Sequence, residues 1–81
     1  MRKRLMGESQ CRAAQVRYYL LEEEFEDGIS YGVQIELGNE AAAVSNISPS
    51  LRRVQELAAA LVQGGVTPVA LRDVVDDWLL E

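Results

Sequence analysis

The chain has 81 residues, a formal net charge of −5 and no histidine. A chain of this length supports one domain with a single core. The negative charge disfavours binding to nucleic acid, whose phosphates attract a basic surface. Without histidine, the commonest general base and metal ligand are missing, so we expect no enzyme activity, no cofactor and no metal site.

Cys11 is the only cysteine, which excludes an internal disulfide bond and is typical of a reducing compartment. No apolar run approaches the ~20 residues that a membrane-spanning helix needs. We therefore expect a cytoplasmic protein that does not span a membrane.

The first ten residues mix charged, polar and apolar side chains without periodicity. Such a segment has no face to bury, so we expect residues 1–10 to form a flexible tail. Residues 11–81 are then the single folded domain.

Two strands are predicted next, at Val16–Phe25 and Ile29–Leu37, because apolar side chains alternate with polar ones in the second segment. A three-residue loop at Glu26–Gly28 would place Leu21 opposite Val33 and gather apolar residues on one face. A loop of only Asp27 and Gly28 would put carboxylates on the buried face and is rejected.

In the preferred register, alternate residues of the first strand point away from the core. We expect them to form an apolar patch with two alanines of a third strand, and this patch is the candidate partner surface. Its residues are Val16, Tyr18, Leu20, Ala41 and Ala43.

The third strand is predicted at Glu40–Asn46, after a two-residue turn at Gly38–Asn39. In this strand Ala42 faces Ile35, and Val44 faces Val33. The three strands form an antiparallel meander.

Ser48-Pro49 and Thr67-Pro68 each open a segment with apolar residues at helical spacing, which predicts two helix starts. Gly64-Gly65 ends the first helix. The fold class is therefore α+β: a three-stranded antiparallel sheet with a two-helix hairpin packed on one face.

A second candidate site lies at the start of the first helix, where free backbone N–H groups could bind an anion. Its residues are Ser48, Ser50, Arg52 and Arg53. The alternative is that the serines cap the helix and the arginines pair with acidic residues of the second helix.

The segment Val66–Leu79 carries a resemblance, together with Tyr31-Gly32-Val33 and Asn46-Ile47-Ser48. From about residue 16 to residue 80, the chain resembles a family of small bacterial proteins known only as a domain of unknown function. The resemblance implies a fold and a bacterial origin, and it names no catalytic residue.

These observations favour a non-catalytic protein-interaction or regulatory adaptor module, with self-association into a homodimer as one form. The alternative is a small sensor of anions or nucleotide ligands at the start of the first helix. We expect a protein partner or a second copy of the chain, and no nucleic acid.

Overall fold

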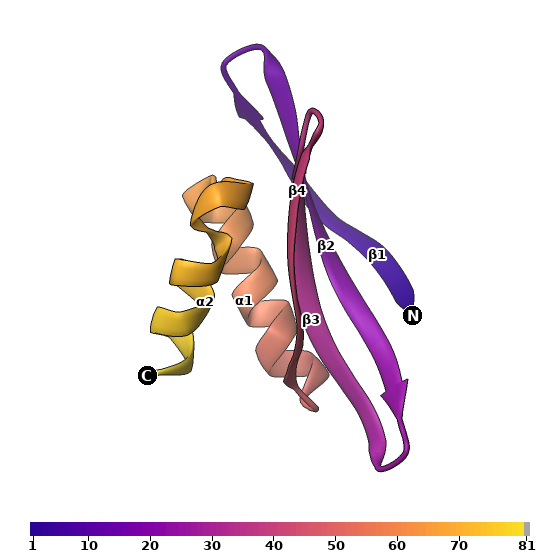
Figure 1. The fold of residues 1–81 in the computed structure, drawn as a ribbon. Coiled ribbons are helices and arrows are strands. Elements are labelled where there is room, and N and C mark those ends of the chain that lie inside the picture. The colour runs from indigo at the N-terminus through magenta and orange to yellow at the C-terminus, as the bar shows by residue number, and fades with distance from the viewer. Residues whose placement is uncertain (81) are drawn as a thin grey trace.

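A computed structural model describes residues 1–80 as a four-stranded sheet followed by helices (Figure 1). The strands are β1 (Arg2–Cys11), β2 (Ala14–Phe25), β3 (Gly28–Leu37) and β4 (Glu40–Ser48). They form an antiparallel meander in the order β1-β2-β3-β4. The helical elements are α1 (Leu51–Gly64), the 3₁₀ turn η1 (Pro68–Ala70) and α2 (Leu71–Leu79). Figure 1 shows both helices on the same face of the sheet, which confirms the α+β class.

The sheet has four strands rather than the expected three, because the first residues form β1. The expectation of a flexible tail at residues 1–10 is therefore wrong. A β-bulge between Leu5 and Gly7 interrupts the alternation of side chains in β1, so the segment shows no period of two. Hydrogen bonding to β2 gives this polar segment its extended structure, as is common for an edge strand.

The register between β2 and β3 also differs from the prediction. Phe25 pairs with Gly28, so the loop is Glu26-Asp27, and Leu20 rather than Leu21 lies opposite Val33. A shift of one residue turns every side chain of β2 to the other face. The sequence could not fix this choice because β2 carries apolar side chains on both faces.

The core lies between the helices and one face of the sheet. Tyr18 and Leu20 of β2 are 1% and 2% exposed, and they pack with the buried face of α1. The core cluster consists of Val16, Tyr18, Leu20, Val33, Ile35, Val54, Leu57, Ala58, Leu61, Leu71 and Val75. One apolar interior thus joins β2 and β3 to both helices.

The pairing of β3 with β4 agrees with the prediction: Ala42 lies opposite Ile35, and Val44 lies opposite Val33. After the pair of Val33 and Val44, a bulge in β4 lies opposite Gly32. A Cβ atom at Gly32 would lie 2.7 Å from the Cα atom of Ser45, so only glycine fits where β4 crosses so closely.

The helix boundaries follow the capping residues. Ser50, rather than Ser48, caps α1 by accepting a hydrogen bond from the backbone N–H of Arg53. Gly65 ends α1 in the left-handed conformation, with φ of 59°. After Thr67, Pro68 begins the turn η1, and α2 continues from Leu71.

Candidate functional site

The predicted partner surface is divided between the two faces of the sheet. Val16, Tyr18 and Leu20 face the helices and belong to the core, so their expected outward orientation is wrong. The shifted register between β2 and β3 is the physical reason. Ala41 and Ala43 are exposed on the face opposite the helices, as expected.

The open face of β2 and β3 carries a polar network centred on Glu36. The Lys3 ammonium donates a hydrogen bond of 3.1 Å to the Glu36 carboxylate, and the Gln34 amide donates another of 2.8 Å. Lys3 also lies 4.4 Å from the centre of the Tyr19 ring, and Arg17 lies 3.9 Å from the carboxylate. These contacts tie β1, β2 and β3 together, beside the apolar side chains of Leu5, Tyr19 and Leu21 on the same face.

The same contacts set the electrostatics of the network. The hydrogen bond from Lys3 holds the pKa of the Glu36 carboxyl below its ordinary value, outweighing the opposite effect of burial. Glu36 therefore stays charged through the neutral pH range and holds Lys3 in place.

The two edges of the sheet differ in charge. β1 begins with Arg2, Lys3 and Arg4, whereas Glu40 is the only charged residue of β4. Like charges on an edge strand oppose its pairing with a second copy of the same strand, so β1 is protected against self-pairing and β4 is not.

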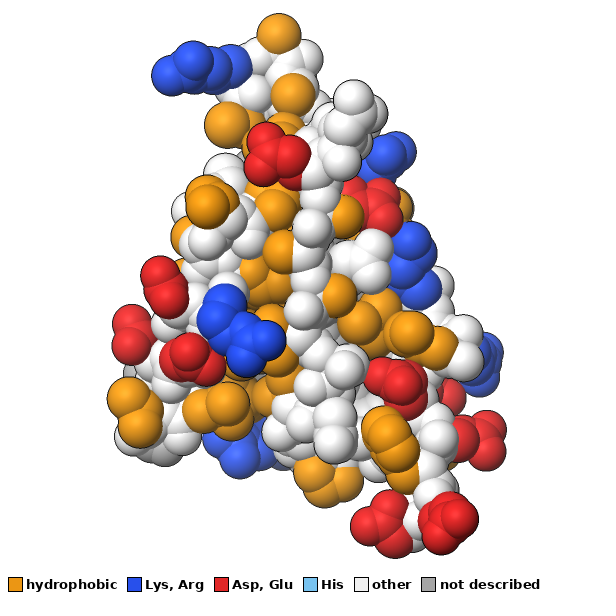
Figure 2. Space-filling model, viewed as in Figure 1, with side chains coloured by type: hydrophobic (Ala, Val, Ile, Leu, Met, Phe, Trp, Pro, Cys, Tyr) orange, Lys and Arg blue, Asp and Glu red, His pale blue; other side chains and the backbone are white. Residues whose placement is uncertain are grey.

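The surroundings of β4 add apolar surface to its unprotected edge. The turn η1 and helix α2 pack against β4, and Val69 of η1 is 85% exposed. Figure 2 shows the backbone of β4 uncovered along the centre of the molecule, with hydrophobic side chains on both sides. The exposed Ala41 and Ala43 lie on this strand.

The four residues of the predicted anion site do lie together at the start of α1. Ser48 accepts a hydrogen bond of 3.1 Å from the backbone N–H of Ser50, and Ser50 in turn caps α1. Arg52 forms an ion pair of 3.5 Å with Glu56, and Arg53 lies 4.8 Å from the centre of the Trp78 ring. Each of the four side chains therefore already has a partner within the chain.

The capping role of Ser50 follows the alternative interpretation of this segment. Ser48 does not cap α1, and the arginines also differ from that interpretation. Arg53 meets an aromatic ring of α2 rather than an acidic side chain. A guanidinium group stacks favourably on an indole face, and this contact joins the start of α1 to α2.

Within residues 1–80, no group of three or more His, Cys, Asp or Glu side chains is arranged to hold a metal ion. No helix in this part of the chain is both long and apolar enough to cross a bilayer. Cys11 is a partly buried free thiol at the end of β1.

Fold and surface together define a small α+β domain with one helix-covered face, one open face that carries the Glu36 network, and two unlike edges. The chain belongs to a family described as a family of unknown function (DUF6514), whose model matches residues 2–81. This match confirms the resemblance to an uncharacterised family of small domains and extends it over β1. Neither the curated proteins nor the solved structures gave a match.

Proposed function

We propose that this protein is a non-catalytic interaction module that forms a homodimer by pairing its β4 edge with the β4 edge of a second copy. The observation that carries the proposal is the uncovered and almost uncharged edge of β4. An edge strand presents unpaired backbone N–H and C=O groups, which favour the addition of another strand.

The residues of β4 suit a symmetric antiparallel pair. With the two-fold axis at Ala42, Ala41 of one copy lies opposite Ala43 of the other, and Glu40 lies opposite Val44. No like charges meet, and the alanines allow close approach. Val69 adds exposed apolar surface beside the same edge.

The edge of β1 does not suit self-pairing. A two-fold axis at Lys3 would place Arg2 opposite Arg4 across the strands, where like charges destabilise the pair. The contrast between the edges supports a dimer that joins through β4 and leaves β1 free.

Measuring molar mass in solution tests the proposal, at protein concentrations from about 10 μM to about 1 mM because a short strand interface gives weak affinity. We expect the mass to rise towards that of a dimer. The double variant Ala41→Lys/Ala43→Lys places lysines opposite each other and should remain monomeric. The control is Ala59→Lys/Ala60→Lys, which adds the same charge at two exposed positions of α1.

A wild-type protein that stays monomeric over the whole range would refute the dimer. So would a β4 variant that dimerises as well as the α1 control, provided that thermal unfolding shows both variants to be folded.

The alternative of an anion or nucleotide sensor at the start of α1 has less support. Both serine hydroxyls there accept backbone hydrogen bonds, and both guanidinium groups have partners within the chain.

A further inference from the structure

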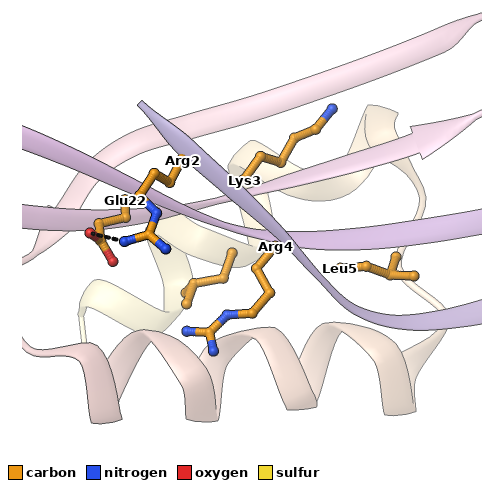
Figure 3. Close-up of a pocket in the computed structure, with 6 residues that line it drawn as sticks. Arg2, Lys3, Arg4, Leu5 and Glu22 are labelled. Carbon is orange, nitrogen blue, oxygen red and sulfur yellow. Dashed lines mark ion pairs between the residues drawn. The ribbon is translucent and has the colours of Figure 1, made fainter.

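A pocket of about 520 Å³ lies beside the first half of β1. It is lined by Arg2, Lys3, Arg4, Leu5, Leu20 and Glu22. Figure 3 shows the Arg4 side chain extending from β1 towards α1, and Arg2 directed to Glu22. The pocket therefore combines two guanidinium groups with the apolar residues Leu5 and Leu20.

The three consecutive cations of β1 differ in their contacts. Lys3 points to the open face and is held by Glu36 at 3.1 Å. Arg2 and Arg4 lie on the helix side, because they pair with Glu22 and Leu20 of β2.

The two arginines are only weakly neutralised. Arg2 reaches Glu22 at 3.7 Å, with 85% of its own side chain exposed. Arg4 is exposed and forms no ion pair among residues 1–80. The pocket thus presents one loosely held and one unpaired guanidinium group.

This basic pocket contrasts with the rest of the surface. The chain has a net charge of −5, and Figure 2 shows acidic side chains gathered over α2 and at the β2–β3 hairpin. A guanidinium group binds a carboxylate through two parallel hydrogen bonds, so the pocket is complementary to carboxylates.

The backbone beside the pocket adds a second requirement for the ligand. As an edge strand, β1 presents unpaired N–H and C=O groups on its outer side. A strand added there would place alternate side chains on the helix side, level with Arg2 and Arg4. The ligand should therefore be extended, with carboxylates two residues apart.

We propose that the free edge of β1 binds an acidic extended peptide segment, which adds to the sheet as a strand and places alternate carboxylates against Arg4 and Arg2. This site lies at the opposite edge of the sheet from β4. It is therefore independent of the proposed dimer, and a monomeric protein would retain it.

The test uses a fluorescent eight-residue peptide in which glutamate alternates with threonine, and measures its anisotropy with the full chain. We expect saturable binding that weakens as salt rises, and at least tenfold weaker binding of the matching glutamine–threonine peptide. Arg4→Gln should weaken binding of the acidic peptide about tenfold or more. The matched control is Arg72→Gln, at an exposed position of α2, and should leave binding unchanged.

Three outcomes would overturn the proposal: equal binding of both peptides, equal effects of the two arginine variants, or no binding at all. A peptide whose backbone nitrogens are methylated on the pairing side should lose binding, and unchanged binding would exclude strand addition. Displacement of the peptide by inorganic phosphate at constant ionic strength would instead indicate a phosphate site.

Discussion

The phenolic hydroxyl of Tyr18 donates a hydrogen bond of 2.9 Å to the backbone carbonyl of Val66. This contact joins β2, in the middle of the sheet, to the connection between α1 and η1. Tyr18 is 1% exposed, and the hydrogen bond to Val66 is partly buried. It holds the connection between α1 and η1 against the apolar face of the sheet.

Replacing Tyr18 by phenylalanine tests this contact. Tyr18→Phe keeps the ring in the core but leaves the Val66 carbonyl without its partner, and should lower the free energy of unfolding by about 1 kcal/mol. Denaturation by urea at neutral pH measures the change. If Tyr31→Phe, at a half-buried tyrosine without a hydroxyl hydrogen bond among residues 1–80, costs as much, the Val66 contact is not the cause.

The same tyrosine should make stability depend on alkaline pH. Burial raises the pKa of Tyr18 above its ordinary value of 10.0, because the charged phenolate is poorly solvated in the core. Above pH 10 the unfolded chain loses this proton before the folded chain does, so the folded state loses stability as pH rises. The stability advantage of wild type over Tyr18→Phe should shrink in urea titrations between neutral pH and about pH 11. A constant advantage would contradict the burial effect.

Glu36 should act in the opposite pH range. The pKa of Glu36 is lowered, chiefly by the hydrogen bond from Lys3. The charged Glu36 side chain therefore stabilises the fold at pH values above its ordinary pKa of 4.5. That contribution is lost as pH falls through the lower pKa of the folded state. Glu36→Gln should therefore be less stable than wild type at neutral pH, and the difference should narrow in acid. Glu26→Gln, at an exposed position, is the control. A stability difference between wild type and Glu36→Gln that stays constant with pH would be evidence against the network.

Gly32 should tolerate no larger residue. A Cβ atom there would collide with the backbone of Val44 and Ser45, which cannot move as a flexible side chain would. Gly32→Ala should cost about 2 kcal/mol or more, because either β4 must separate from β3 or the bulge must change. Thermal unfolding measures the loss. Gly28→Ala is the comparison. Gly28 has a φ of 137° and open space where a Cβ atom would lie, so this variant measures backbone strain without a steric clash.

Ser30 offers a stabilising change. Its hydroxyl is buried and has no hydrogen-bond partner in the part of the chain that the structure describes. Ser30→Ala removes this unpaired group and should leave stability unchanged or raise it by up to about 1 kcal/mol. A loss of more than about 1 kcal/mol in chemical denaturation would reveal a partner for the hydroxyl.

The elements with a clear period were predictable from the sequence. β3 alternates apolar and polar residues, and α1 ends at Gly65 where a left-handed residue is required. The pairing of Ala42 with Ile35 followed from the short turn between β3 and β4. In each case the spacing of apolar residues and the turn or capping residue at the end of the element predicted the same structure.

The existence of β1 and the register of β2 could not be predicted, because both depend on contacts with other elements that the sequence alone does not show. Met6 sits at the bulge of β1 and breaks the alternation on which strand prediction depends. The register of β2 is decided by packing, since Tyr18 and Tyr19 offer similar apolar surface to either face. As a result, three of the five predicted partner-surface residues belong to the core, whereas Ala41 and Ala43 remain exposed.

The basic pocket was present in the sequence only as a triplet of cations. Arg2, Lys3 and Arg4 suggest a solvated terminus as long as the segment is taken to be unstructured. Once β1 is a strand, alternation separates Lys3 from the two arginines and sends them to opposite faces. The missing signal was the strand itself, which the bulge conceals.

Pairing of β4 with β4 is tested most directly by NMR on a mixture of isotope-labelled and unlabelled protein, which detects contacts between copies. If β4 pairs with β4, nuclear Overhauser effects should connect Ala41 of one copy with Ala43 of another, at concentrations where the molar mass rises. Contacts between copies that arise at β1 or the helices, with none at β4, would contradict it.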